Sequence, residues 1–434
     1  MKELVKKYFL EILLIVIVFV NIFLHILPEI PLALFLVALS LFRTGAIGAL
    51  VLSSCALPVL LGSALYVIGV TGVATIVQIV LFFVCLYLWI VKKEIVFYNF
   101  KNVFILLVSI LALFSLSSFF TQGGDYALIK IKDATLFGVV VLFAYGFFFS
   151  NPQKCYYTRV GLYLILYSFL MLLISPLLNN SAGPANIFDI GYLRAQNTMI
   201  LSEEKFVVDY QYVGMFATMG CAYIFLDSMK KKLNILFLLF CAFLCTLSSL
   251  YSGARQYVII SLLLLLFAFF QQKKSYSRIL PVLFGAVIVA FLYNILSGDE
   301  GMFYSVKEEG YMDASGRGLY LLKGVNDFLE NPLFGVGFGR FDFYGEYGRY
   351  PHNLFVEILC ELGIFGLLFI SVVLFKPLKN LLLKEKACIP LLLVYFLRSM
   401  TSGGLDSNIM MFSFIIATMS LSNVKRDFIV LQRI

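Results

Sequence analysis

The chain has 434 residues, of which 61% are hydrophobic and only 13% are charged, and its mean hydropathy is +0.96. These values exclude an ordinary soluble enzyme and predict an integral membrane protein. The formal net charge of +8 could suit a nucleic-acid-binding protein, but the basic residues concentrate in the short loops between apolar segments, as in membrane proteins.

Apolar segments recur along the whole chain, so we expect a single integral membrane domain over residues 1–434. The Lys-rich start lacks a small-residue cleavage site, which predicts a retained first span. The expected membrane segments are residues 8–27, 31–42, 46–61, 72–91, 103–120, 134–149, 160–178, 207–227, 233–250, 256–270, 279–296, 353–375, 387–400 and 409–421. The second and third flank Arg43 and form either one hairpin dipping into the bilayer or two spans. The fold prediction is an all-α polytopic protein with 12 to 14 transmembrane helices.

The positive-inside rule assigns a side to each loop. With a cytoplasmic N-terminus, the inner loops hold about two thirds of the 33 basic residues, whereas most of the 25 acidic residues lie outside. Because the span count is even, both termini are expected in the cytoplasm. The net charge is therefore a topology signal that also suits anionic lipid headgroups, and no nucleic-acid partner is needed to explain it.

Metal, nucleotide and disulfide sites find no support in the sequence. Seven of the eight cysteines lie in apolar runs and Cys155 lies in a basic loop, so we expect free thiols. The chain lacks CxxC and HExxH, and its Gly-rich stretches lack the contexts that bind nucleotides. We therefore expect no metal site and no cofactor.

Three outer loops are long, at about residues 121–133, 179–206 and 297–352, and the last is the large external loop in which function should be sought. Arg255 in YSGARQY lies in a tight turn between two spans, and Arg317 in DASGRGLY lies in the large loop. Guanidinium groups bind phosphate oxygens bidentately, so both are candidates for a phosphate site. Alternatively, Arg255 snorkels to the interface and Arg317 is a solvated loop charge.

The stretch NPLFGVGFGRFDFYGEYGRYPHN, residues 331–353, combines glycines that permit close turns with aromatic residues that stack on sugars or lie in the membrane interface. An ordinary aromatic belt is an equally good reading. Arg340 and Arg349 add positive charge nearby. The turn RSMTSGGLDSN, residues 398–408, either completes the same outer cavity or is a plain helix connection.

The stretch RYPHNLFVEILCELGIFG begins an apolar helix that either His352 or Asn353 can cap. Asn353, Glu357 and Glu361 recur every four residues and so share one helix face. A carboxylate at membrane depth must face the bundle interior or a wet cavity, and histidine suits proton abstraction near neutral pH. The alternative is a capping histidine with glutamates paired to nearby arginines. The second histidine, His25, is expected to be structural.

In their order and spacing, Ser315-Gly316-Arg317, NPLFGVGFGRF and HNLFVEILCELGIFG resemble the signature region of the O-antigen ligase and polymerase superfamily of bacterial membrane glycosyltransferases. The Ser-Gly-Ala-Arg turn resembles that family's arginine between two mid-chain spans. The resemblance covers about residues 240–420 by motif and the whole chain by topology. It implies a GT-C-type glycosyltransferase bundle in the bacterial inner membrane, with its active site on the outer side.

The resemblance also implies a donor glycan on an undecaprenyl diphosphate carrier and catalysis without a metal ion. It implies that Arg255 and Arg317 hold the diphosphate and that His352 is the base. Direct attack of an acceptor hydroxyl would invert the anomeric centre. Further substrate contacts, or groups that orient His352, are sought among Arg194, Arg340, Arg349, Asn353 and Glu357.

We expect a polymerase that joins lipid-linked O-antigen or capsule repeat units, because outer loops such as residues 179–206 suit a sugar acceptor. A ligase that moves the finished chain onto lipid A core would share donor, fold and chemistry. A flippase is a third reading, but the chain has no internal repeat and concentrates its polar residues at the outer surface. The expected partners are the lipid-linked oligosaccharide, membrane lipids and a chain-length regulator protein.

Overall fold

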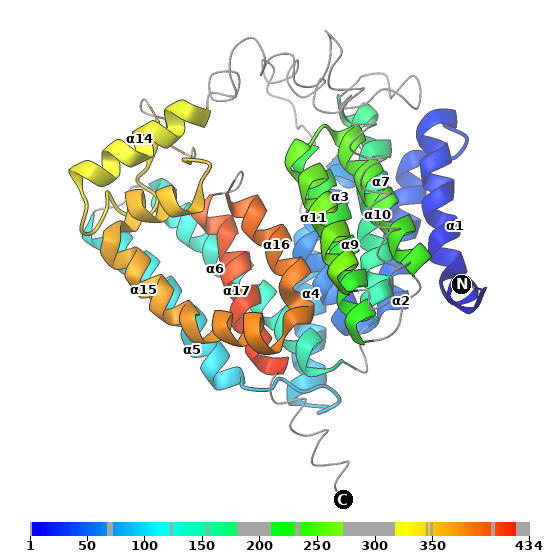
Figure 1. Cartoon of the computed structure of the whole chain (residues 1–434), viewed down its shortest axis with the longest axis horizontal. Helices are drawn as coiled ribbons and strands as arrows, with labels where there is room; N and C mark the ends of the chain where they lie inside the picture. The colour runs from blue at the N-terminus through cyan, green and yellow to red at the C-terminus, as the bar shows by residue number, and fades with distance from the viewer. Residues whose placement is uncertain are drawn as a thin grey trace, which may run out of the picture. The chain divides into compact units, whose positions relative to one another are not determined.

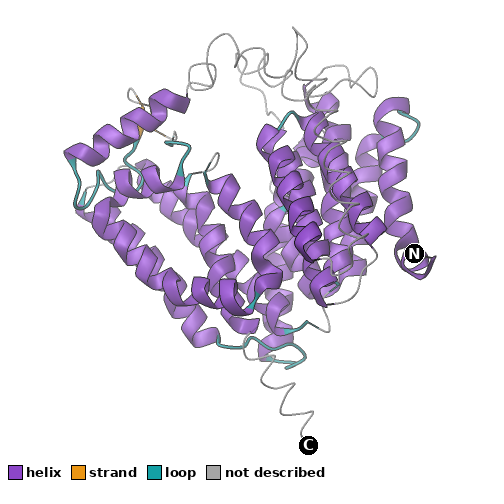
Figure 2. Ribbon diagram, in the orientation of Figure 1, coloured by secondary structure: helices purple, strands orange, loops and turns teal. Residues whose placement is uncertain are grey.

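The computed structural model (Figure 1) describes residues 2–66, 73–121, 125–152, 156–179, 210–230, 235–271, 317–343, 346–347, 350–400 and 404–421. Nearly all of these residues are helical (Figure 2), which confirms the predicted α-helical class. The helices group into two compact units, Met1–Glu94 with Pro152–Ser297 and Ile95–Asn151 with Gly298–Ile434.

The first unit is a bundle of apolar helices. Its helices are α1 (Lys2–Leu24), α2 (Glu29–Cys55), α3 (Leu57–Tyr66), α4 (Val73–Ile90), α7 (Tyr157–Asn179), α9 (Tyr210–Lys230), α10 (Ile235–Ser252) and α11 (Arg255–Gln271). The backbones of α7 and α9 lie close together at two glycines. A Cβ atom at Gly161 or Gly220 would meet the carbonyl oxygen of the other glycine, so glycine at both positions permits this approach.

Residues 31–61 are interrupted close to the predicted boundary between the second and third segments. Within α2 (Glu29–Cys55) the backbone is non-helical at Gly45, with a φ of 70° and a ψ of 171°, and α3 follows. Whether these residues form a hairpin in the bilayer or two spans stays a prediction. Arg43, expected at the turn between two segments, lies inside α2. Its guanidinium lies 2.9 Å from Glu11 Oε1, and Arg159 pairs with the same oxygen at 2.9 Å. The helix continues through Arg43 because a buried carboxylate, rather than water, compensates the charge.

The second unit contains the described parts of the predicted loop 297–352, which are residues 317–343, 346–347 and 350–352. Its elements are α5 (Phe100–Phe120), α6 (Asp125–Ser150), α14 (Arg317–Glu330), β1 (Asp342–Phe343), β2 (Glu346–Tyr347), α15 (Leu354–Lys384), η1 (Lys386–Cys388), α16 (Ile389–Ser399), α17 (Leu405–Ala417) and η2 (Thr418–Ser420). The strands pair antiparallel, Asp342 with Tyr347 and Phe343 with Glu346. α6 packs on α17, and the Ser413 hydroxyl donates to the Gly138 carbonyl at 2.9 Å.

Within the described residues, four helices are long and apolar enough to cross a membrane: α2, α5, Tyr157–Pro176 of α7, and α15. Shorter apolar helices accompany them, and the number of 12 to 14 spans stays a prediction. The seven described cysteines are buried and free, as expected from their apolar surroundings, whereas Cys155 lies outside the described residues.

Candidate functional site

Helix α15 is broken at Gly363, where φ is 65° and ψ is −169°. In a continuous helix, the N–H groups of Ile364 and Phe365 would donate to the carbonyl groups four residues earlier. Instead, Ile364 N donates to Pro332 O at 2.9 Å and Phe365 N donates to Leu333 O at 3.2 Å. The predicted span over 353–375 is therefore two helices, residues 354–362 and residues 364–384.

The two carbonyl groups released by the break are paired as well. Cys360 O accepts from Val336 N at 2.8 Å, and Glu361 O accepts from Gly337 N at 3.0 Å. Residues 332–337, which we call the clasp, thus supply a partner for each of these four backbone groups. Irregular backbone at membrane depth requires such pairing within the protein, because lipid offers none.

Glycine in the clasp is needed for its close approach to α15. Gly335 has a φ of 71°, and a Cβ atom there would meet the backbone of residues 360–362. Only glycine fits both the left-handed conformation and the missing space. The glycines do permit close turns, as predicted, but this one also pairs with a broken helix, a role that the sequence did not indicate.

The N-terminal half of α15 starts just after His352. Asn353 is its N-cap, and Asn353 Oδ1 accepts from the N–H groups of Phe355 at 3.0 Å and Val356 at 3.2 Å. Of the two predicted caps, Asn353 is the one observed. This leaves His352 outside the helix, directly before its N-cap.

His352 has a left-handed backbone, with a φ of 57°. That conformation is strained for a residue other than glycine, and such residues cluster at functional sites. The imidazole ring contacts Tyr350, with centroids 4.3 Å apart, and Tyr320 of α14, with centroids 5.6 Å apart. Two tyrosines from different segments therefore fix the orientation of the ring.

Helix α14 contains both Arg317 and Tyr320, the residue that contacts the His352 ring. Arg317 is the first residue of this helix, and Tyr320 follows three positions later, about one turn along the backbone. One turn further on, a Cβ atom at Gly324 would meet Pro351 and Val356, so α14 packs on the start of α15. The backbone thus places Arg317 one turn before the residue that contacts the His352 ring.

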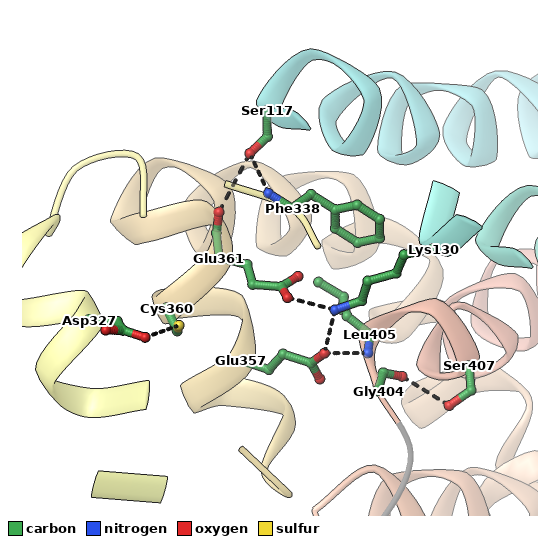
Figure 3. A network of polar contacts seen from close by, with 10 residues as sticks. All are labelled: Ser117, Lys130, Asp327, Phe338, Glu357, Cys360, Glu361, Gly404, Leu405 and Ser407. Atoms are coloured by element: carbon green, nitrogen blue, oxygen red, sulfur yellow. Dashed lines mark hydrogen bonds and ion pairs between the residues drawn. The ribbon is translucent and has the colours of Figure 1, made fainter. Parts of the chain in front are cut away.

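Below the N-cap, three charged side chains form a buried cluster (Figure 3). Lys130 of α6 donates from Nζ to Glu357 Oε1 at 2.9 Å and to Glu361 Oε1 at 2.6 Å. The exposed fractions of Lys130, Glu357 and Glu361 are 3%, 0% and 1%. At the start of α17, Leu405 N also donates to Glu357 Oε1 at 2.7 Å. We call Lys130, Glu357 and Glu361 the charge cluster.

The charge cluster confirms that Glu357 and Glu361 share one face, since both contact the same ammonium group. Their partner is a lysine rather than one of the arginines considered from the sequence. The sequence does not single out Lys130 as a site residue. It lies in the predicted outer loop 121–133, just before an apolar segment, where a lysine usually snorkels to the interface. Its two partners lie 227 and 231 residues away along the chain, so no local pattern indicates the pairing.

The other predicted site residues lie in several places. Arg340 donates from Nη1 to the Thr121 carbonyl at the end of α5. Arg255 is the first residue of α11 after the turn at Gly253 and Ala254, so the predicted tight turn is confirmed, but it belongs to the first unit. Arg194 and Arg349 lie outside the described residues.

An apolar groove of about 870 Å³ runs between residues 113–121 of α5 and residues 362–372 of α15, with Phe334 of the clasp beside them. The two hydroxyl groups in its lining form hydrogen bonds within the protein. The Thr121 hydroxyl donates to Ser117 O at 2.8 Å, and Ser117 Oγ accepts from the N–H group of Phe338 at 3.1 Å. Arg340 adjoins the end of the groove at Thr121. The volume is typical of ligand sites, and the apolar lining suits a hydrocarbon chain.

A comparison with known protein families gives a match over the part of the chain that contains α14, the clasp and the first half of α15. Residues 235–371 match the family model described as O-antigen ligase, which confirms the resemblance to the O-antigen ligase and polymerase superfamily. The match spans the turn before Arg255, α14, the clasp and the first part of α15. Together with the apolar helices, it indicates an integral membrane protein. No curated protein and no solved structure matches the chain.

Proposed function

Because residues 235–371 carry an O-antigen ligase family domain, we propose that the protein is a membrane polysaccharide polymerase. It transfers a glycan from undecaprenyl diphosphate to the end of another lipid-linked repeat unit. The observation that carries this proposal is His352, which lies at the start of a broken helix and contacts two tyrosines, one of them Tyr320, one turn after Arg317 in α14.

In the proposed reaction, an acceptor hydroxyl attacks the anomeric carbon of the donor sugar while the bond to the diphosphate oxygen breaks. His352 takes the hydroxyl proton, and the carrier leaves as a diphosphate anion. That leaving group needs fixed positive charge rather than a strong acid, and Arg255 and Arg317 supply it. One direct displacement inverts the anomeric centre, and no step requires a metal ion.

The proposed setting is a GT-C-type bundle of 12 to 14 spans in the bacterial inner membrane. Its support is the charge bias of the loops, which favours cytoplasmic termini and an external position for His352. Arg194, Arg349 and Asn353 are proposed contacts to sugar or diphosphate. A chain-length regulator is the proposed protein partner of a polymerase of this kind.

We further propose that the groove between α5 and α15 holds the hydrocarbon chain of the carrier, with Arg340 near its phosphates. Replacing Val372 in the groove by tryptophan should raise KM for a donor with a full-length polyprenyl chain by about tenfold, because one filled subsite costs about 1.4 kcal/mol of binding. KM for a donor with a short isoprenyl chain should not change. Initial rates with the two donors measure both values.

Phe375→Trp provides the matched control, since Phe375 is exposed on the same helix but does not line the groove. This variant should leave KM unchanged for both donors. If Val372→Trp raised KM equally for the long and the short donor, the groove would not be the chain site.

A ligase that transfers the finished chain to lipid A core is the second candidate, favoured by the name of the matching family model. Deleting the gene and separating the cell's glycans on a gel distinguishes the two. Core bearing a single repeat unit indicates a lost polymerase, whereas bare core with accumulated lipid-linked polymer indicates a lost ligase. Repeat units accumulating on the inner leaflet would contradict both and indicate a flippase.

A further inference from the structure

We propose that Lys130 is a positioning residue, which holds the first half of α15, and with it His352, through Glu357 and Glu361. This inference rests on the proposed function, because it gives Lys130 a task in the same reaction. Lys130 itself contacts no candidate reacting group among the described residues, so it acts through the helix.

The first half of α15 cannot set its own direction. Residues 354–362 span only about 13 Å at 1.5 Å per residue, and helices this short are not stable alone. The break at Gly363 also removes the two backbone bonds that would tie this half to the rest of α15. Its orientation must therefore come from tertiary contacts.

Besides the packing of α14 against residues 351–360, backbone and charged contacts hold the half-helix at two places. At the C-terminal end, the clasp pairs with Cys360 O and Glu361 O. Nearer the N-terminal end, Glu357 accepts hydrogen bonds from both Lys130 of α6 and Leu405 N of α17. Glu357 lies in the first turn of the helix, so it anchors the end that follows His352.

Lys130 also joins these two places. Its ammonium group lies 5.0 Å from the ring centroid of Phe338, the residue directly after the clasp. Phe338 in turn stacks on Phe114 of α5, with centroids 4.4 Å apart. One buried cation thus contacts both carboxylates of the half-helix and the segment that carries the clasp.

The charge balance makes Lys130 the critical member. One ammonium group contacts two buried carboxylates, with the carboxylate of Asp406 nearby, and the N-terminus of α17 adds partial positive charge through Leu405 N. Removing Lys130 would leave two buried carboxylates facing each other, which strongly favours movement of the half-helix toward water. Removing the charge of either glutamate would leave one balanced pair, but Glu357 also accepts from Leu405 N and lies in the first turn after His352, so its loss affects the half-helix more than the loss of Glu361.

The test uses the fact that the chain has only two histidines. A His25→Gln background leaves His352 as the single histidine, so histidine labelled with ¹³C at Cε1 gives one NMR signal in the purified full-length protein. In this background, Lys130→Met should shift or broaden the signal and lower kcat by about 100-fold, the cost of a misplaced catalytic group. KM for the lipid-linked donor should stay nearly constant, and Lys130→Arg should restore most of the rate.

Glu361→Gln is the matched control and should change both the NMR signal and kcat far less than Glu357→Gln does. Folded Lys130→Met protein with an unchanged signal and unchanged kcat would overturn the proposal. If Lys130→Met does not fold, the comparison of the two glutamine variants decides, and equal effects would overturn it. Failure of the proposed function would show separately, because the NMR signal does not depend on glycosyl transfer.

Discussion

Replacing His352 by alanine should lower kcat for glycosyl transfer by about 10²- to 10⁴-fold, the usual contribution of a general base. KM for the lipid-linked donor should change little, because the diphosphate is proposed to bind at arginines. The folded protein should persist, since His352 lies outside α15 and Asn353 is the N-cap. Initial rates and the melting temperature of the purified protein measure these effects.

His25→Ala is a suitable control for this experiment. His25 also has a positive φ, of 47°, so both substitutions affect a histidine with the same type of backbone. Its imidazole lies 3.0 Å from Glu29, and no role in the reaction is proposed for either residue. His25→Ala should keep the full rate. A His352→Ala protein that also kept it would exclude His352 as the base.

Local patterns predict much of the second unit correctly. The period of four between Asn353, Glu357 and Glu361 places the glutamates on one face, and both do contact Lys130. A capping residue before the apolar run predicts the start of α15, and Asn353 is the observed cap. Such features depend on neighbours within one or two turns, which a single sequence contains.

The features that the sequence did not predict depend on contacts between residues far apart along the chain. The apolar run after His352 looks like one span, and glycines are common in membrane helices, so nothing marks Gly363 as a break. What makes the break stable is the clasp, about 30 residues earlier, with its four complementary backbone groups. Arg43 lies two residues before the interruption at Gly45, near the predicted boundary, but its partner Glu11 lies 32 residues earlier and no local pattern indicates that pairing.

The broken helix and the charge cluster belong to one arrangement. If α15 were continuous, residues 354–362 would lie on the same axis as residues 364–384. The break frees a half-helix of two or three turns, and the clasp and the charge cluster then fix it from either end. A membrane protein can in this way hold a polar group such as His352 in one orientation, independent of the axis of the long span.

Because Gly363 lies against the backbone of the clasp, we expect its replacement to lower the stability of the protein strongly. Its φ of 65° and ψ of −169° lie in a region that only glycine readily occupies, and a Cβ atom there would meet the backbone of Leu333 and Phe334. Gly363→Ala should therefore cost about 1–3 kcal/mol of folding free energy from backbone strain and a further 1–3 kcal/mol or so from the clash. Hydrogen exchange should show loss of protection at the amides of Ile364 and Phe365, whose partners lie in the clasp.

Gly45→Ala separates the strain from the clash. Gly45 has nearly the same backbone conformation, with a φ of 70° and a ψ of 171°, but no heavy atom lies within 4 Å of its added Cβ atom. This variant should show only the strain, about 1–3 kcal/mol, and should leave the amides of Ile364 and Phe365 protected. Equal loss of stability in the two variants, with protection retained in both, would mean that the clasp does not hold α15 closely. Because the clasp and the charge cluster act on the same half-helix, Gly363→Ala should also lower kcat in folded protein, whereas Gly45→Ala should not.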